Sequence, residues 1–99
     1  MSLDIRDNEQ ESRFETTVDS NVAYVAYDLE DPDRIVFTHT TVPEALSGRG
    51  LANELVTHAL DAARARGLKV VPQCSFVAKF MKKHPEYEDL LANAPLPAG

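Results

Sequence analysis

The chain has 99 residues, of which 43% are hydrophobic, which is enough apolar material for one compact domain and too little for two. Its formal net charge of −6 argues against a general nucleic-acid binder, because affinity for a phosphate backbone depends on clustered Lys and Arg side chains. The single cysteine, Cys74, excludes an internal disulfide and a paired-cysteine zinc motif.

Residues 1–13 are polar and acidic and lack the apolar centre of a signal peptide, and no run has the length of a transmembrane span. We therefore expect a cytoplasmic protein with no membrane or nucleic-acid partner, present as a monomer or a homodimer. The domain is expected to span residues 13–88, with flexible tails at residues 1–12 and 94–99.

Three β-strands are predicted in antiparallel succession. Residues 13–18 alternate apolar and polar side chains, and residues 19–21 supply a turn. Residues 22–29 are rich in β-formers and are followed by a second turn that contains Pro32. The third strand is expected over residues 34–42.

A long amphipathic helix is predicted from Gly50 to Arg66, because its apolar residues fall on about half of the circumference at helical spacing. Gly67 is placed to cap the end of this helix. A short strand over residues 68–72 then requires a parallel crossover, so the sheet is predicted to be mixed.

A second helix is expected from Phe76 to about Lys83, with Ser75 as its cap and its end set by the residue before Pro85. Residues 88–93 are expected to add a weak turn. The predicted class is therefore α/β, with three antiparallel strands, a helix, a parallel strand and a short C-terminal helix.

The loop between the third strand and the long helix reads Ser47-Gly48-Arg49-Gly50-Leu51-Ala52. Backbone amides at a helix start point in one direction and carry the positive end of the helix dipole, so they can hold a phosphate group. A Walker loop would need Gly-Lys-Ser or Gly-Lys-Thr, and a dinucleotide fingerprint would need a small residue where Asn53 stands. Both of these glycine-loop motifs are excluded, while an ordinary tight turn stays an alternative.

The order of the elements, this loop and the later segment Val71-Pro72-Gln73-Cys74-Ser75-Phe76-Val77 resemble the GCN5-related N-acetyltransferases. The match is closest to their small, atypical branch of N-acetyltransferase-like domain proteins and covers residues 13–87. The resemblance implies a minimal fold of this superfamily with a splayed mixed sheet. It further implies acetyl-CoA as co-substrate, an amine of a small molecule or a protein as acceptor, and no metal.

In this superfamily the loop has Gln or Arg, two variable residues, Gly, one variable residue and then Gly or Ala, and it wraps the pyrophosphate of acetyl-CoA. Gly50 and Ala52 match the two small positions, whereas Ser47 stands where Arg or Gln is usual. The residues expected to bind the cofactor are Thr41, Val42, Ser47, Gly48, Arg49, Gly50, Leu51 and Ala52.

Two residues are candidates for catalysis. The resemblance implies that Cys74 lies close to the acetyl group, where it could accept an acyl group, although a free cysteine can equally be a small buried hydrophobe. His39 is expected to share a strand face with Phe37 and Thr41, and from there it could act as a general base toward Cys74 or the amine. A partly buried histidine without a catalytic role is the alternative.

Two further alternatives are open at this stage. Lys79, Lys82 and Lys83 could meet the ribose phosphate of CoA, or they could only stabilise the C-terminus of their helix. The whole chain could be an N-acetyltransferase, acting directly or through an acetyl-cysteine. It could instead be a non-catalytic module that binds CoA or a protein partner.

Overall fold

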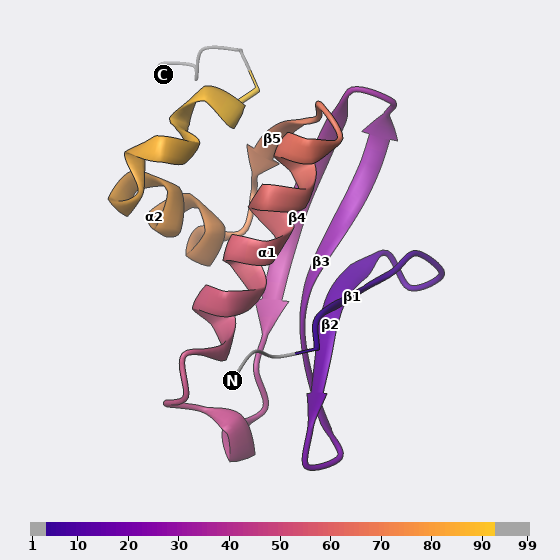
Figure 1. The fold of residues 1–99 in the computed structure, drawn as a ribbon, viewed down its shortest axis with the longest axis vertical. Coiled ribbons are helices and arrows are strands. Elements are labelled where there is room, and N and C mark those ends of the chain that lie inside the picture. The colour runs from indigo at the N-terminus through magenta and orange to yellow at the C-terminus, as the bar shows by residue number, and fades with distance from the viewer. Residues whose placement is uncertain (1–3, 93–99) are drawn as a thin grey trace.

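The computed structural model describes residues 4–92, except the side chains of Glu30 and Asp31. The elements in this range are, in chain order, β1 (Arg6–Asn8), β2 (Arg13–Val18), β3 (Asn21–Asp31), β4 (Arg34–Thr41), η1 (Glu44–Leu46), α1 (Leu51–Ala65), β5 (Lys69–Pro72), α2 (Ser75–Lys83) and η2 (Pro85–Leu90), where η denotes a 3-10 helix (Figure 1).

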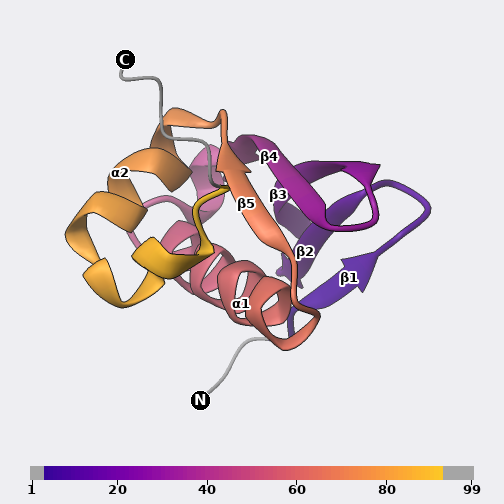
Figure 2. The same cartoon turned by 90° about the horizontal axis from the view of Figure 1, so that it is seen from above.

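The strands form one sheet in the order β1-β2-β3-β4-β5. The first four strands pair antiparallel, and β5 pairs parallel to β4. The helix α1 connects these two parallel strands and crosses one face of the sheet, and α2 lies beside it, near β4 and β5 (Figure 2). The predicted mixed α/β architecture is confirmed, and β2 and β3 lie close to the ranges predicted for the first two strands.

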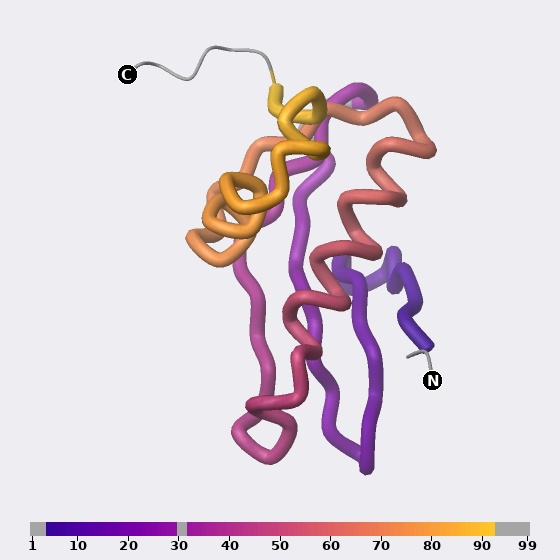
Figure 3. Tube along the Cα trace, turned by 60° about the vertical axis from the view of Figure 1, so that its left-hand side comes forward, coloured from indigo at the N-terminus to yellow at the C-terminus, as the bar shows by residue number. Residues whose placement is uncertain are grey.

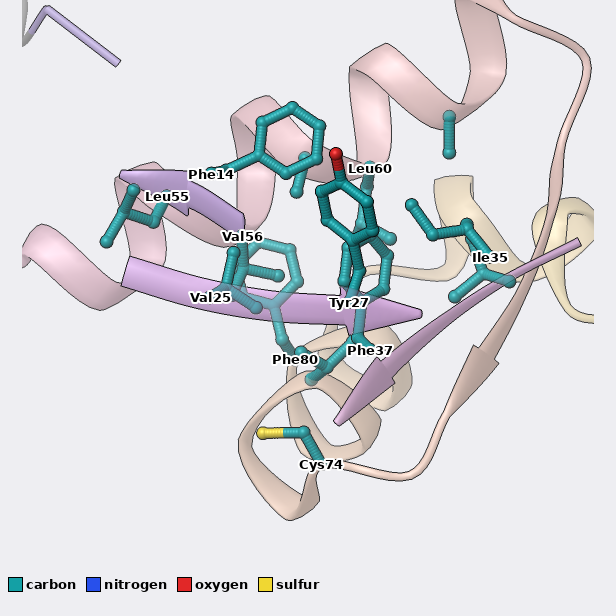
Figure 4. Close-up of a cluster of buried hydrophobic side chains, with 14 of the residues drawn as sticks. Phe14, Val25, Tyr27, Ile35, Phe37, Leu55, Val56, Leu60, Cys74 and Phe80 are labelled. Atoms are coloured by element: carbon teal, nitrogen blue, oxygen red, sulfur yellow. The ribbon is translucent and has the colours of Figure 1, made fainter. Parts of the chain in front are cut away.

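The core lies between α1 and the inner face of the sheet (Figure 4). The helix contributes its apolar stripe, with Leu55 and Leu60 both fully buried. The sheet contributes residues at alternating positions, such as Phe14, Val25 and Phe37, each at most 2% exposed. At about 25 cal/mol per Å² of apolar surface removed from water, this layer supplies the main driving force for folding.

The C-terminal end of α1 follows the prediction. Gly67 has a φ of +70° directly after the last residues of the helix. Its amide donates to the carbonyl of Arg64, and the amide of Leu68 donates to the carbonyl of Ala63 at 2.9 Å. This pair of bonds is a Schellman motif, which satisfies carbonyls that the helix end would leave unpaired.

The N-terminal segment differs from the expected flexible tail. Residues 6–8 form β1, which pairs with β2 from Arg6↔Glu15 to Asn8↔Arg13. The hydroxyl of Tyr27 donates to Asp7 at 2.6 Å, and burial together with this bond raises the pKa of Tyr27 well above its usual value. Hydrogen bonds hold this polar strand in place, so apolar patterning could not predict it. The other expected tail, residues 94–99, lies outside the described residues.

The start of α2 also differs from the prediction. The capping position is taken by Cys74, whose carbonyl accepts the amide of Ala78 at 3.0 Å, and Ser75 is the first helical residue. The hydroxyl of Ser75 therefore does not cap the helix. The predicted end at Lys83, before Pro85, is confirmed.

The segment after α2 forms η2 over Pro85–Leu90, where the sequence indicated a weak turn over residues 88–93. The chain then returns to the sheet, where Leu91 forms a parallel bridge with Val70 and the amide of Ala92 donates to the carbonyl of Val70 at 2.9 Å. In Figure 3 the gold segment that contains η2 lies at the upper end of the molecule and leads to the last described residue.

Candidate active site

The sheet opens between β4 and β5. The pairing of these strands runs from Arg34↔Lys69 to Phe37↔Pro72. Beyond it β4 continues to Thr41, while the segment after β5 turns into α2 (Figure 1). The amide of Cys74 donates to the carbonyl of Phe37 at 2.9 Å, at the point where the strands separate. The opening leaves the last residues of β4 without a strand neighbour on this side among residues 4–92.

A β-bulge lies on β4 at this opening. Ala26 of β3 faces His39, whereas the next residue, Tyr27, faces Phe37, so Thr38 is an extra residue without a partner in the register. An inserted residue shifts the alternation of side chains by one position. The residues beyond Thr38 therefore change faces relative to the regular pattern assumed in the sequence analysis.

The bulge brings Thr40, and not His39, to Cys74. Thr40 pairs with Val25, a residue of the inner face, and its Oγ1 lies 3.3 Å from the Sγ of Cys74. Cys74 is 7% exposed and packs in the core below Phe37 (Figure 4). Hydroxyl and thiol thus form a polar contact between β4 and the N-terminus of α2.

His39 lies on the opposite face of the sheet, where its side chain is exposed. Its ring makes an edge contact with Tyr24, with 5.8 Å between centroids, and the guanidinium of Arg13 lies 4.5 Å from the centre of the Tyr24 ring. Arg13 also donates to Glu15 at 2.7 Å and holds the pKa of that carboxyl below its usual value. The expectation that His39 shares a face with Phe37 is therefore wrong, and the bulge is the physical reason.

The glycine loop precedes α1 as the sequence indicated. Gly48 and Gly50 have φ angles of +79° and +74°, which are left-handed conformations that favour glycine. Apart from its neighbours in the chain, a Cβ atom built on either glycine would meet no atom of residues 4–92 within 4 Å. The loop therefore faces open space at both glycines.

The first turn of α1 has amides available for a ligand. Within residues 4–92 no side chain caps this helix, and its first backbone bond is from the amide of Glu54 to the carbonyl of Gly50 at 3.2 Å. Among the described residues, no backbone carbonyl accepts the amides of Leu51, Ala52 and Asn53. Unpaired amides of this kind, at the positive end of a helix dipole, form an anion-binding arrangement.

The side chains of the loop lie in different environments, and only some of them face solvent. Ser47 donates from its hydroxyl to the carbonyl of Glu44 at 2.9 Å, so its side chain is tied to η1. Leu51 is 5% exposed and belongs to the core, and Val42 packs against that core. Arg49 remains half exposed at the surface, 3.7 Å from a carboxylate oxygen of Asp19. Neither this contact nor the contact between Thr40 and Cys74 could be predicted from the sequence pattern.

A cleft of about 410 Å³ separates the N-terminal half of α1 from α2. Its lining residues are Asn53, Thr57, Phe76, Lys79, Phe80, Lys83 and His84. Lys79 and Lys83 thus face the helix whose N-terminus follows the glycine loop. Lys82 lines a different, more apolar cleft of about 320 Å³ on the other side of α2.

Across residues 4–92, no cluster of three or more His, Cys, Asp or Glu side chains has an arrangement that could hold a metal ion. In the same part of the chain, no helix has the length and apolarity needed to cross a membrane.

A mixed sheet that opens between two parallel strands, with a glycine loop leading into the connecting helix, defines a domain of the N-acetyltransferase type. The family model described as GCN5-related N-acetyl-transferase matches residues 13–90, and the chain belongs to this family. The fold also matches the NMR solution structure of a GCN5-like protein from Staphylococcus aureus. The TM-score is 0.72 at 28% identity, over 98% of this chain and 96% of that one.

Curated relatives with sequence similarity carry the name Protein NATD1. The proteins of Danio rerio and Xenopus tropicalis are 34% and 32% identical over 67 and 63 residues, which are 66% and 64% of this chain. The human protein is 33% identical over 63 residues. The matched segment spans 61%, 58% and 56% of the length of these three relatives, which is less than two thirds.

Proposed function

We propose that the chain binds acetyl-CoA through the loop from Ser47 to Ala52 and transfers its acetyl group to an amine. The observation that carries this proposal is the set of unpaired amides at the start of α1, next to glycines that face open space. A pyrophosphate needs convergent N–H donors and room for close backbone approach, and this loop offers both.

The same region carries basic side chains that would contact the phosphate groups of CoA, with Arg49 at the pyrophosphate and Lys79 and Lys83 at the ribose phosphate. Arg49 lies in the loop, and Lys79 and Lys83 line the cleft between α1 and α2. Lys82 is not proposed as a ligand contact because it lines the other cleft. The structure thus favours two of the three lysines that the sequence left undecided.

The opening between β4 and β5 is the proposed place of the thioester. The nitrogen of the amine attacks the thioester carbonyl carbon, the carbon–sulfur bond breaks, and CoA leaves as a thiolate that takes up a proton. Main-chain groups of Thr41 and Val42 would face the carbonyl oxygen and stabilise the charge that develops there. His39 is proposed to accept the proton of an amine that approaches from the outer face of the sheet.

A route through Cys74 is the alternative for the same reaction. Its thiol would lose a proton, accept the acetyl group and release CoA, and the acetyl group would then pass to the amine. The contact of Cys74 with Thr40 and its place at the N-terminus of α2 support this route, since helix N-termini favour thiolates. Its burial in the core supports the direct route.

A second candidate function is a CoA-binding or partner-binding module without catalysis. Two observations favour it. His39 and Cys74 lie on opposite faces of the sheet, so they do not form a nucleophile and base pair. The hydroxyl of Ser47 donates to the carbonyl of Glu44, so its proton is not available to a phosphate group.

Titration with CoA, monitored by thermal unfolding, tests the binding proposal. Ligand at about 100 times its Kd stabilises the folded state by roughly 2.7 kcal/mol, which raises the Tm of a domain of this size by about 10 °C or more. Absence of a shift at millimolar CoA would refute CoA binding, and with it the acetyltransferase and the CoA-binding module, so that a plain scaffold or protein-interaction role would remain.

Catalysis is tested with acetyl-CoA and four classes of amine: a small amine, a polyamine, a lysine peptide and a free peptide N-terminus. Mass spectrometry after mixing with acetyl-CoA reports an acetyl group on Cys74, and Cys74→Ala is the matched control. An acetylated peptide that disappears in this variant supports the cysteine route, whereas full turnover of Cys74→Ala supports direct transfer. Binding of CoA without product from any amine supports the module.

A further inference from the structure

The phosphate loop contains one basic side chain, Arg49, and this side chain is engaged by a carboxylate. Nη1 of Arg49 lies 3.7 Å from Oδ2 of Asp19, and the side chains are 51% and 75% exposed. Asp19 belongs to the turn between β2 and β3, which lies about 30 residues earlier in the chain. The contact therefore joins the proposed anion site to a separate element of the sheet.

The turn holds Asp19 in a defined place. Val18 and Asn21 form the last pair of the hairpin, and the two residues between them, Asp19 and Ser20, have φ angles of 52° and 66°. Two residues with positive φ make the tight turn whose twist matches an antiparallel hairpin. The side-chain amide of Asn21 also donates to the carbonyl of Asp19 at 3.1 Å. The sheet thus fixes the backbone of Asp19, whereas Arg49 sits on the loop.

Two further carboxylates belong to the elements on either side of the loop in the chain. Glu44 stands in the first turn of η1, and Glu54 stands in the first turn of α1. Asp19 is the carboxylate that contacts Arg49, in a chain whose formal net charge is −6. A diphosphate that enters this loop must compete with Asp19 for the guanidinium of Arg49.

We propose that Asp19 acts as an internal competitor for Arg49 and thereby lowers the affinity of the loop for phosphate groups. This inference rests on the proposed function of the loop. In the free protein Asp19 holds the guanidinium at the β2–β3 turn, and a bound diphosphate takes it over. Asp19 thus sets the concentration range in which the protein responds to CoA, without being a part of the binding surface.

The test uses Asp19→Asn, which removes the charge and keeps the size of the side chain. Asparagine tolerates a positive φ at least as well as aspartate, so the turn is retained. Calorimetric titration with CoA and with inorganic pyrophosphate is expected to give a Kd about fivefold lower than that of the wild type at low salt. The difference should shrink at about 0.5 M salt, where exposed charges are screened.

Two controls make the result specific. Asp28→Asn removes one exposed negative charge elsewhere on β3 and should leave both affinities unchanged. In an Arg49→Gln background the effect of Asp19→Asn should largely disappear, because the competition acts through the guanidinium.

The outcomes separate the inference from the function. If wild-type protein binds CoA and Asp19→Asn binds equally or more weakly, the inference is overturned and the binding function stands. An undiminished gain in the Arg49→Gln background also overturns it, because Asp19 would then act on the anion directly. If neither protein binds CoA or pyrophosphate, both the inference and the function fail.

Discussion

Substituting Gly50 by alanine is the sharpest test of the phosphate loop. The residue has a φ of +74°, and a Cβ atom there would meet no atom of residues 4–92 within 4 Å apart from its neighbours in the chain. The cost of the substitution is therefore conformational rather than steric. An L-residue in the left-handed region costs about 1–2 kcal/mol, and alanine recovers a part of this by restricting the unfolded chain. We expect a net loss of about 1 kcal/mol in unfolding free energy, or roughly 4–8 °C in Tm.

Gly67 provides a matched control. It has a φ of +70° and the same open space around a built Cβ atom, but it lies at the other end of α1. Gly67→Ala should therefore lose about as much stability as Gly50→Ala. The two variants should differ in CoA affinity, since Gly50 directly precedes the unpaired amides of α1 whereas Gly67 follows the other end of the helix.

Chemical denaturation and calorimetric titration measure the two quantities separately. We expect Gly67→Ala to bind CoA like the wild type, and Gly50→Ala to bind at least tenfold more weakly. Equal CoA affinity in both variants would refute the assignment of the loop as the phosphate site. A loss of stability well above 2 kcal/mol in Gly50→Ala alone would refute the argument that the surrounding space is open.

Two further substitutions test the polar contacts of the fold. The hydroxyl of Tyr87 donates to Asp61 at 2.8 Å, and burial and this bond raise the pKa of Tyr87 to about 12. This hydrogen bond contributes fully to the free energy of unfolding below pH 10, where the Tyr87 hydroxyl is protonated in the folded and the unfolded chain. The contribution is lost as the pH rises toward 12, because the hydroxyl ionises at a lower pH in the unfolded chain than in the folded one. Tyr87→Phe should thus be less stable by about 1 kcal/mol at pH 8, and this difference should narrow above pH 10 in melts at several pH values. A difference that stays constant would contradict the assignment. The hydroxyl of Thr16 is buried without a hydrogen-bond partner among residues 4–92, and the residue is 2% exposed. Thr16→Val should therefore raise the unfolding free energy by about 1 kcal/mol in urea titrations, and a decrease would indicate a partner for the hydroxyl.

Apolar patterning predicted most of the elements because the core is built from it. The stripe of α1 and the alternation in β2 and β3 both reflect burial against the same layer, and burial leaves a direct trace in the sequence. The glycine loop was equally readable, since positive φ angles restrict the choice of residue. These are features that a local segment determines by itself.

The bulge at Thr38 left no such trace. A threonine fits a regular strand and a bulge equally well, and the extra residue becomes visible only when the register between β3 and β4 is known. This one residue decided which side chain meets Cys74. β1 escaped prediction for a related reason, because its three polar residues are held by partners distant in sequence, such as Tyr27.

The return of the chain at Leu91 has a consequence for solubility. An open strand edge presents unpaired amides and carbonyls that can recruit a strand from another molecule and start aggregation. The bridge from Leu91 to Val70, with the amide of Ala92 on the carbonyl of Val70, occupies this edge of β5. A fusion that replaces the chain from Leu91 onward would expose this strand edge and favour aggregation. A fusion attached beyond Ala92 would keep the edge covered.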